Sequence, residues 1–519
     1  MSSYHYNLGL SFSAVAEQHG DRPALRYPNG RNVTYRQLLV RARQMARLMS
    51  SRGLGMGDVV CIFPNQSIDA FATVLAALSM GVIYTHLDLN LPDATLQSMM
   101  EQARPQLVLA SRSDRLRACA LSNHVGRRLI CFEDPQIQTE LMAHPADELM
   151  ETPAVTGHHP AYLMFDIEAE GQPTASMITH ANLLNFVAWV RERFMVSPDD
   201  VFTHLNHLAY ENGVFDLFGS LFNGASLVPI GREVLHQPRE LINTVNDMGC
   251  TMWYSVPSLL IYLLRLHALR PGDLRGLCTV AFGGETFPKA PLRALARHLG
   301  AGIRLMNVYS LAEATSIGAA YTVNPRDLVE DRLLPLGHFA ENFQAHVLND
   351  QGQPVPVGQV GELYLSGPNL GLGYYRDAAR TEQAFFRYVN EKHIPETVFR
   401  TGDLVRQDPE TGYYHFVGSR RNRVERSGHV IELELIEASL GSLEGVSECA
   451  VVYLRDAQGQ GRIVAYVNAK DFDGEVLMMA LRCRLPQHML PEQIVSLSPL
   501  PKHADGKVNR QQLAEMTLS

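Results

Sequence analysis

The sequence predicts an α/β protein with a large N-terminal domain and a small, separate C-terminal one. A chain of 519 residues is too long for one hydrophobic core, so two or more domains are expected. Between residues 34 and 330, segments with helical apolar spacing alternate with short buried strands, which is typical of parallel α/β layers. From 337 to 416, short strands with Gly/Pro turns predict a β-barrel-like lobe instead.

The first α/β subdomain begins with a helix at 34–53, where apolar residues recur at helical spacing and Gly53 ends the pattern. Val59 to Phe63 then predicts a short buried strand. The alternation continues with helices at 68–80 and 92–103 and with strands at 82–86 and 106–110.

A second α/β subdomain follows between about 180 and 330. Its expected helices are 181–193, 213–223 and 238–248, and its expected strands are 202–205, 226–228, 251–254 and 303–306. After Gly418, a helix at 432–441 and strands at 447–453 and 462–467 predict a separate, small α+β unit. We therefore divide the chain into an N-terminal core, 1–418, and a C-terminal domain, 419–519.

Composition points to an ordinary globular protein. Hydrophobic residues make up 46% and charged residues 19%, and the net charge is −9 with no basic block. Nucleic acid or an anionic membrane is therefore not an expected partner. The uncharged run Ala70–Leu87 is split by Gly81, so we expect a helix and a buried strand there and no membrane insertion.

The cellular location follows from two further patterns. The seven cysteines are scattered and never spaced C-x-x-C, which indicates free thiols in a reducing compartment. No basic leader followed by an apolar core is visible at the N-terminus. Both observations predict a cytoplasmic protein.

The stretch Met306–Glu313 carries the first chemical signal, and it reads as a strand end running into a turn. Tyr309 offers a flat ring on which a purine can stack, and Glu313 offers a hard oxygen ligand for Mg²⁺. Gly283-Gly284-Glu285 lies upstream, and Phe399–Leu404 and Asp505-Gly506-Lys507 lie downstream.

This series of motifs resembles the adenylate-forming superfamily of acyl-CoA ligases, luciferases and nonribosomal peptide synthetase adenylation domains. Asn307–Glu313, Phe399–Leu404 and Asp505–Lys507 stand where that family has N-x-Y-G-P-T-E, Y-R-T-G-D-L and N-G-K. The resemblance spans nearly the whole chain. Within the family, the sequence is most similar to free-standing amino-acid adenylation enzymes, in particular the glycine–carrier-protein ligases of lipid A glycylation.

The resemblance implies that ATP and Mg²⁺ are used to make an aminoacyl-adenylate, which is loaded on the phosphopantetheine thiol of a carrier protein. Lys507 matches the family's catalytic lysine, which stabilises charge on the attacking carboxylate and the α-phosphate. Glu313 matches the magnesium ligand, and Asp403 matches the acceptor of the ribose hydroxyls. The expected nucleotide-binding residues are Gly283, Gly284, Glu285, Asn307, Val308, Tyr309, Ser310 and Asp403.

The same register predicts the amino-acid pocket. Glu211 stands where the family's F-D-x-S-V-W motif has the aspartate that pairs with the α-ammonium, so a cationic amine remains the expected partner. The other expected lining residues are Asn212, Phe215, Tyr254, Val280, Phe282, Val308, Ser316 and Ile317. Because Tyr254 and Phe282 leave little volume, glycine is the expected substrate. The alternative is that these rings belong to the core and the pocket lies elsewhere.

The phosphate loop departs from the family. Asp166, Glu168 and Glu170 replace small hydroxyl residues and glycines, and Thr174 replaces a lysine. Three carboxylates repel a triphosphate, so we expect a solvated acidic loop; the alternative is that they hold an extra metal ion. The hinge motif is also altered, to Gly418-Ser419-Arg420-Arg421.

Two other functions stay open on the sequence. An acyl- or aryl-CoA ligase uses the same chemistry, but Glu211 would then be buried against an apolar acid. The acidic loop motivates the second alternative, a catalytically weak nucleotide-binding relative.

Overall fold

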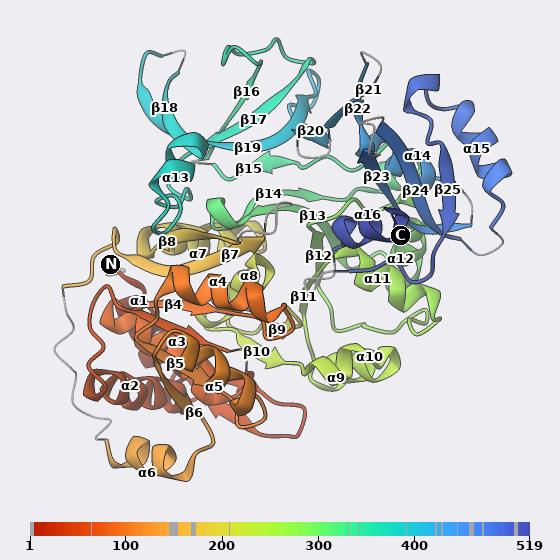
Figure 1. Ribbon diagram of the computed structural model, residues 1–519. Helices are drawn as coiled ribbons and strands as arrows, with labels where there is room; N and C mark the ends of the chain where they lie inside the picture. Colours follow the sequence, from red (N-terminus) through yellow and green to blue (C-terminus); the bar gives the residue numbers. More distant parts are fainter. Residues whose placement is uncertain are drawn as a thin grey trace.

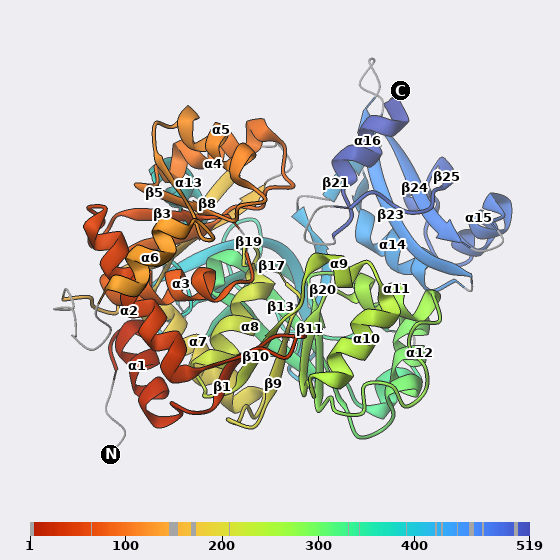
Figure 2. The same ribbon diagram turned by 90° about the horizontal axis from the view of Figure 1, so that it is seen from below.

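The computed structural model consists of two stacked sheets with their helices, a third sheet above them and a C-terminal unit at one side (Figures 1 and 2). The structure describes residues 5–63, 65–144, 154–167, 173–206, 208–330, 332–341, 343–390, 392–420, 423–426, 429–443, 445–455, 461–469, 472–502 and 507–518. This arrangement confirms the predicted fold class, with two α/β subdomains, a strand-rich lobe and a smaller C-terminal domain.

A nine-stranded sheet forms the centre of the second subdomain. In spatial order its strands are β15 (His338–Phe339), β14 (Ser316–Thr322), β13 (Arg304–Leu311), β12 (Thr279–Gly283), β11 (Met252–Ser255), β9 (Val201–His204), β10 (Ser226–Pro229), β1 (Pro23–Arg26) and β2 (Asn32–Thr34). The strands from β13 to β1 are parallel, whereas β14, β15 and β2 add to the sheet in the antiparallel sense.

A six-stranded sheet forms the first subdomain. Its strands in spatial order are β6 (Arg128–Cys131), β5 (Leu107–Ala110), β3 (Val59–Ile62), β4 (Ile83–His86), β7 (Pro160–Ile167) and β8 (Pro173–Thr179). All neighbours are parallel except β7 and β8, which form an antiparallel pair. The carboxyl end of β7 and the start of β8 flank the acidic loop.

Helices form three layers around these two sheets. They are α1 (Leu8–Gln18), α2 (Tyr35–Ser51), α3 (Ile68–Met80), α4 (Asp93–Ala103), α5 (Arg115–His124), α6 (Pro135–Ala143), α7 (His180–Arg193), α8 (Glu211–Leu221), α9 (Arg232–Leu235), α10 (Pro238–Asp247), α11 (Pro257–Arg265) and α12 (Lys289–Leu299). Helices α1, α2, α3, α7 and α8 share one buried cluster with both sheets and so lie between them. Helices α10 to α12 cover the other face of the nine-stranded sheet, and α4 and α5 cover that of the six-stranded sheet.

Local sequence signals explain where these helices begin and end. Thr34 and Gln37 form a reciprocal capping box at the start of α2, which satisfies two backbone donors. Gly81, with φ 69°, ends α3 in the left-handed conformation that glycine adopts most easily. The run Ala70–Leu87 is therefore the predicted helix and strand, and within the described residues no helix has the length and apolar character to cross a membrane.

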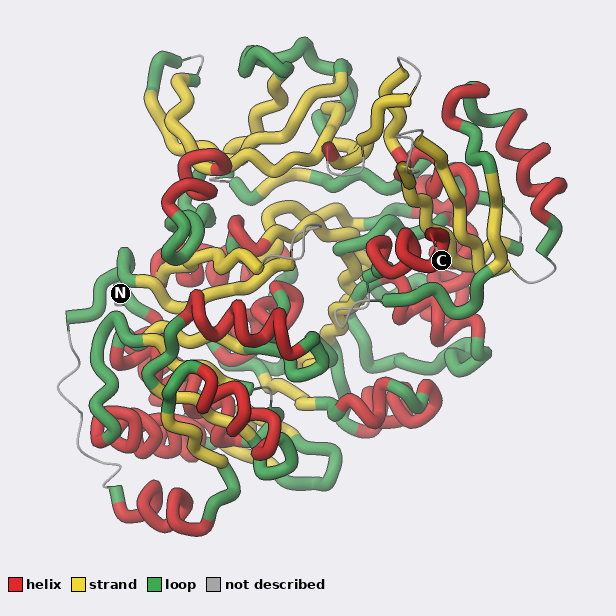
Figure 3. The backbone as a smooth tube through the Cα atoms, in the orientation of Figure 1, coloured by secondary structure: helices red, strands yellow, loops and turns green. Residues whose placement is uncertain are grey.

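The third lobe is built around a sheet, whose strands Figure 3 shows in yellow with green loops between them. It contains β16 (Gln344–Leu348), β17 (Val360–Ser366), β18 (Phe385–Val389), β19 (Pro395–Gln407) and β20 (Tyr414–Ser419), with α13 (Ala378–Ala384) beside it. The long strand β19 pairs with β18 near its start and with β20 near its end, so it organises the whole sheet. Leu363, Leu365 and Val405 form the core of this lobe.

The C-terminal unit begins after β20. Its elements are β21 (Arg423–Arg426), β22 (His429–Glu432), α14 (Leu433–Gly441), β23 (Val446–Arg455), β24 (Gly461–Ala469), α15 (Gly474–Arg482), β25 (Gln493–Ser496) and α16 (Arg510–Leu518). Helices α14 and α15 pack on one face of the β23–β24–β25 sheet and α16 on the other. The unit lies beside α11 and α12, and Arg265 of α11 donates a hydrogen bond to Asn468 of β24 at 3.1 Å (Figure 2).

Two boundaries differ from the sequence-based expectation near the site. The strand expected at 303–306 continues to Leu311, because β14 pairs with β13 along this length, from Met306 opposite Thr322 to Leu311 opposite Ser316. Tyr309 is therefore a strand residue, and the turn begins only at Ala312. The helix expected at 213–223 begins at Glu211, which places this carboxylate in the first turn.

Candidate functional site

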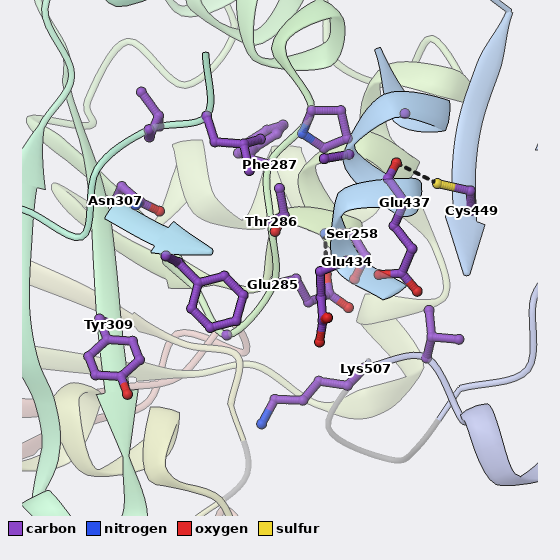
Figure 4. Close-up of a pocket in the computed structure, with 18 of the residues that line it drawn as sticks. Ser258, Glu285, Thr286, Phe287, Asn307, Tyr309, Glu434, Glu437, Cys449 and Lys507 are labelled. Atoms are coloured by element: carbon purple, nitrogen blue, oxygen red, sulfur yellow. Dashed lines mark hydrogen bonds between the residues drawn. The ribbon is translucent and has the colours of Figure 1, made fainter. Parts of the chain in front are cut away.

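A cleft of about 410 Å³ lies between the N-terminal part of the chain and the C-terminal unit. Figure 4 shows that its walls come from both, with Tyr309 and Asn307 on one side and Glu434 and Glu437 on the other. The site residues predicted from sequence that line it are Gly284, Glu285, Asn307, Val308, Tyr309, Ser310, Asp403 and Lys507. Motifs separated by more than two hundred residues thus meet in one cavity.

The two glycines at the end of β12 keep this part of the cleft open. A Cβ on Gly283 would lie 2.3 Å from the carbonyl oxygen of Val308, which no side chain can tolerate. Gly284 has φ +83°, and a Cβ there would lie 3.4 Å from Cε of Lys507. Both positions therefore require glycine, one for the close approach of β13 and one for its backbone conformation beneath the lysine.

Tyr309 and Asp403 join two subdomains across the cleft. The Tyr309 hydroxyl, on β13, donates a 2.5 Å hydrogen bond to Oδ2 of Asp403 on β19. Burial, together with the negative charge of Asp403, raises the pKa of Tyr309 well above its usual value, so the phenol stays neutral. The pair presents an aromatic ring and a carboxylate side by side, which suits a nucleoside base and its ribose.

Glu313 follows β13 in a short 3₁₀ turn and is buried, with 7% of its surface exposed. Its Oε1 accepts a hydrogen bond from the Tyr374 hydroxyl at 2.9 Å, and its carbonyl accepts one from Gly371. Among the described residues, no three His, Cys, Asp or Glu side chains gather as a metal cage. A single carboxylate still fits Mg²⁺, which proteins bind through one or two carboxylates plus substrate phosphates.

Glu285 and Asn307 line the cleft, and each makes a hydrogen bond to the backbone of a neighbouring segment. Glu285 accepts a hydrogen bond from the backbone N–H of Ser258 at 3.1 Å and so satisfies a donor at the start of α11. Burial raises the pKa of Glu285, and the positive charge of Lys502 opposes that rise. Asn307 donates to the Pro335 carbonyl at 2.9 Å.

The residues expected to bind the amino acid are organised by the first turn of α8. Glu211 lies there, and its Oε1 is 3.3 Å from Nζ of Lys507, which reaches it from the C-terminal unit. The Glu211 side chain is 15% exposed and that of Lys507 is 36% exposed. Burial, with the negative charge of Glu211 adding to it, raises the pKa of Tyr254. A carboxylate, an ammonium group and a neutral phenol therefore share one end of the site.

Several of the expected lining residues do surround Glu211. The Tyr254 hydroxyl donates to Oδ1 of Asn212 at 2.7 Å, and its ring meets Phe215 edge-on at 5.3 Å between centroids. Ser316 donates to the Glu211 carbonyl at 2.8 Å. Ile317 and Val308 belong to the same buried cluster as Phe215 and Tyr254, so this group lies on one face of the sheet.

The structure does not bring Val280 and Phe282 to this group, which corrects the sequence-based pocket. Side chains alternate along a strand, and Phe282 pairs in register with Ser255, one residue beyond Tyr254. Its ring packs edge-on against Phe287 at 4.8 Å in the cluster beneath α10 to α12. The residue that shares the Tyr254 face is Ala281, so Phe282 does not narrow the pocket.

A buried polar group beneath this end was missed from the sequence. Asn206 donates through Nδ2 to the Tyr254 carbonyl at 2.9 Å and to Oδ2 of Asp216 at 3.1 Å. Oδ2 of Asp216 also lies 3.3 Å from Nδ1 of His204. Burial raises the pKa of Asp216 to about 6, although the contacts with His204 and Asn206 act in the opposite direction. Its signal was an aspartate inside an apolar helical run, Val214 to Leu221.

The sequence analysis also did not identify Asp88, which contacts the residue before Glu211. It is buried, and its Oδ2 accepts hydrogen bonds from the Tyr210 hydroxyl at 3.0 Å and from Arg232 at 2.9 Å. Because Tyr210 directly precedes Glu211, this contact ties the start of α8 to the first subdomain.

The acidic loop lies only partly within the described residues. Asp166 is exposed at the end of β7 and pairs in register with Thr174 of β8, which is 2% exposed. Glu168 and Glu170 lie outside the described residues, as do Arg421 of the hinge motif and Asp505 and Gly506 beside Lys507.

Arg420, the last described residue before β21, is held by the third lobe. It forms an ion pair through Nε with Oε2 of the buried Glu362 at 2.8 Å, and it also pairs with Asp350. This anchor ties the segment that follows β20 to the N-terminal part of the chain.

Comparison with known proteins agrees with this architecture. The family model described as AMP-binding enzyme matches residues 12–375, and that of the AMP-binding enzyme C-terminal domain matches residues 435–507. Surfactin synthase subunit 3 of Bacillus subtilis (strain 168) is 30% identical over 97% of this chain, which spans 38% of that protein.

Another relative matches along most of both chains. The L-proline–[L-prolyl-carrier protein] ligase of Pseudomonas fluorescens is 29% identical over 93% of this chain and 94% of its own length. Among solved structures, the four-domain nonribosomal peptide synthetase AB3403, bound to AMP and glycine, superposes with a TM-score of 0.82. The two chains are 24% identical, and the superposed part covers 98% of this chain and 36% of the synthetase. At this identity the likeness shows the fold alone.

Proposed function

Because the chain belongs to the AMP-binding enzyme family, we propose that it is an ATP-dependent ligase that activates an amino acid and loads it on a carrier protein. The observation that carries the proposal is the Glu211 carboxylate in the first turn of α8, 3.3 Å from the Lys507 ammonium. A substrate with both an ammonium and a carboxylate group matches this pair of charges. An apolar carboxylic acid would leave Glu211 without a cation, which disfavours an acyl- or aryl-CoA ligase.

The proposed reaction has two steps. A carboxylate oxygen of the amino acid bonds to the α-phosphorus of ATP, and the bond to pyrophosphate breaks to leave an aminoacyl-adenylate. The phosphopantetheine sulfur then bonds to the carbonyl carbon, its proton is lost, and AMP leaves. Lys507 would stabilise the negative charge that develops at the α-phosphate in the first step.

The nucleotide end of the cleft supports this proposal. Tyr309 would stack on the adenine, and Asp403 would accept hydrogen bonds from the ribose hydroxyls in place of the Tyr309 hydroxyl. Glu313 would hold Mg²⁺, which supplies positive charge that neutralises the phosphate oxygens.

We propose glycine as the substrate, on grounds that differ in part from those of the sequence analysis. Phe282 no longer contributes, but Tyr254 and Phe215 are fully buried beside Glu211, and the Tyr254–Asn212 hydrogen bond fixes their positions. A larger side chain would have to displace these packed rings, which costs about 1–3 kcal/mol. The sequence resemblance extends the proposal to glycylation of lipid A, and the scattered cysteines extend it to action in the cytoplasm.

Amino-acid-dependent exchange between ATP and labelled pyrophosphate tests the proposal. We expect the fastest exchange with glycine and at least a tenfold decrease with alanine, which corresponds to about 1.4 kcal/mol. Lys507→Ala should reduce exchange by about 10²–10³-fold, as for the loss of one transition-state donor. Equal exchange with leucine or phenylalanine would remove glycine from the proposal, and formation of benzoyl-CoA without amino-acid-dependent exchange would favour the CoA-ligase alternative.

A further inference from the structure

The ion pair between Glu211 and Lys507 joins the two groups that are proposed to receive the substrate. We propose that, before an amino acid binds, Lys507 occupies the ammonium position of its own active site, so that substrate binding is an exchange of ion pairs. This inference rests on the proposed function, because it concerns the order in which that site takes its charges. It adds a regulatory role for Lys507 in the state before catalysis.

The geometry supports occupation of the site by the lysine itself. Nζ of Lys507 is 3.3 Å from Oε1 of Glu211, within the range of a hydrogen-bonded ion pair. The lysine stem passes close over Gly284. A Cβ built on Gly284 would lie 3.4 Å from Cε of Lys507, which is an ordinary van der Waals contact. Figure 4 shows the Lys507 side chain extended into the cleft toward the side on which Tyr309 lies.

The cation that the structure pairs with Glu211 is Lys507. The charge of Glu211 also acts on the phenols of Tyr162 and Tyr254, and both are neutral because burial raises their pKa values. In the first turn of α8, the carboxylate also faces the positive end of the helix dipole. The partner that an arriving ammonium group must replace is therefore Lys507.

The charges that a ligand carries decide whether it can replace Lys507 as the partner of Glu211. An α-amino acid brings an ammonium group for Glu211 and a carboxylate for Lys507, so one ion pair becomes two. An amine without a carboxylate would leave Lys507 without its partner. A carboxylic acid without an amine would draw Lys507 away and leave Glu211 buried without a cation. The ion pair thus discriminates against ligands that carry only one of the two charges.

The same contact links the lobes. Glu211 belongs to α8 and Lys507 to the C-terminal unit, so the pair favours the closed arrangement in the absence of substrate. A bound amino acid would take over this bridging role through its own two charges.

The proposed exchange of ion pairs is tested by measuring the binding of glycine and of glycinamide in ligand-observed NMR titrations. Glycinamide keeps the ammonium group but replaces the carboxylate with a neutral amide. In Lys507→Met, which retains the length of the side chain without its charge, Glu211 has lost its resident cation. We expect glycinamide to bind this variant at least tenfold more tightly than it binds the wild type, whereas glycine should bind no more tightly.

Two further variants isolate the charge pair. Lys502→Met removes the same charge from the same unit, at a lysine that pairs with Glu448 at 2.7 Å, and should leave glycinamide binding unchanged. Glu211→Gln, combined with Lys507→Met, should abolish the gain, because the amide has no charge to offer the ligand. A native-like thermal transition and a native-like circular dichroism spectrum show that each variant is folded.

The inference fails if glycinamide binds Lys507→Met no more tightly than the wild type. It also fails if Lys502→Met gives the same gain. Either result is compatible with normal glycine-dependent exchange by the wild type, so the proposed function would stand. Absence of exchange with every amino acid would instead overturn the proposed function, and a gain in glycinamide binding would still support self-occupation by Lys507.

Discussion

The two proposed ends of the site, one for the nucleotide and one for the amino acid, are built in different ways. At the nucleotide end, Tyr309 bonds Asp403 and Glu313 bonds Tyr374, and all four residues precede the C-terminal unit. At the amino-acid end, Glu211 bonds Lys507 across the boundary between the two parts of the chain. The printed hydrogen bonds of Tyr309, Asp403 and Glu313 at the proposed nucleotide end are therefore made within one part of the molecule, whereas the ion pair of Glu211 at the proposed amino-acid end needs a cation from the C-terminal unit.

This difference suggests how the two substrates are handled. A site that is complete within one rigid part keeps its geometry when another lobe moves. If the C-terminal unit moved away, Glu211 would lose the Lys507 cation. Recognition of the amino acid at the proposed site would therefore depend on the position of that unit. Variants at each end should therefore affect one substrate and leave the other nearly unchanged.

The largest expected effect concerns the buried acid beneath the amino-acid end. Burial raises the pKa of Asp216 from 3.8 to about 6 in the folded protein. The folded state then holds a proton that the unfolded state has released, so stability is full below pH 4 and falls as the pH rises toward 6. At about 1.36 kcal/mol per pKa unit, this loss is about 3 kcal/mol.

Asp216→Asn should remove most of that loss. Relative to the wild type, the free energy of unfolding of the variant should improve by up to about 3 kcal/mol between pH 4 and pH 7. Urea denaturation at both pH values measures the difference. Asp199→Asn, at a side chain that is 88% exposed, should show no comparable change. A constant difference between Asp216→Asn and the wild type across this range would contradict the assigned pKa.

The nucleotide end provides the next test. Asp403→Asn keeps an oxygen for the Tyr309 hydroxyl but removes the charge that would accept the ribose hydroxyls. Hydrogen bonds to charged groups are worth about 1.5–3 kcal/mol, so KM for ATP should rise at least about tenfold. KM for the amino acid should stay within about twofold. Initial-rate measurements with each substrate varied in turn check this, and a parallel rise in both values would break the contrast between the two ends.

The structure brings together the residues expected at the nucleotide end, but it separates Val280 and Phe282 from the others expected at the amino-acid end, and the reason is physical. Tyr309 and Glu313 lie in one short motif, and Asp403 in another, so their spacing needs no knowledge of strand pairing. The amino-acid end depends on which face of β11 and β12 each residue occupies. A one-residue change of parity moves a side chain to the other face, which is why Phe282 was assigned to the pocket and Ala281 was missed.

The fold followed the same logic. The helices and strands that the sequence analysis placed mostly agree with the structure within a few residues, because apolar periodicity and glycine stops are local signals. The length of β13 was not predicted, because its last residues form a strand only through antiparallel pairing with β14. The ion pair between Glu211 and Lys507 also escaped prediction, because it joins residues 296 positions apart.

The smallest expected effect tests the two faces directly. Tyr254→Phe removes only the hydroxyl that donates to Asn212 at 2.7 Å, on the face of the sheet that holds Glu211. Loss of one hydrogen bond costs about 1 kcal/mol, so kcat/KM for the amino acid should fall about fivefold while KM for ATP is unchanged.

Phe282→Leu is the matched variant on the opposite face, where the ring packs against Phe287. It should lower the free energy of unfolding by about 1 kcal/mol without changing the ratio of kcat/KM for glycine and alanine. If Phe282→Leu instead admits alanine while Tyr254→Phe has no effect, the pocket lies on the face beneath α10 to α12. The assignment of Ala281 and Tyr254 to the amino-acid end would then be wrong.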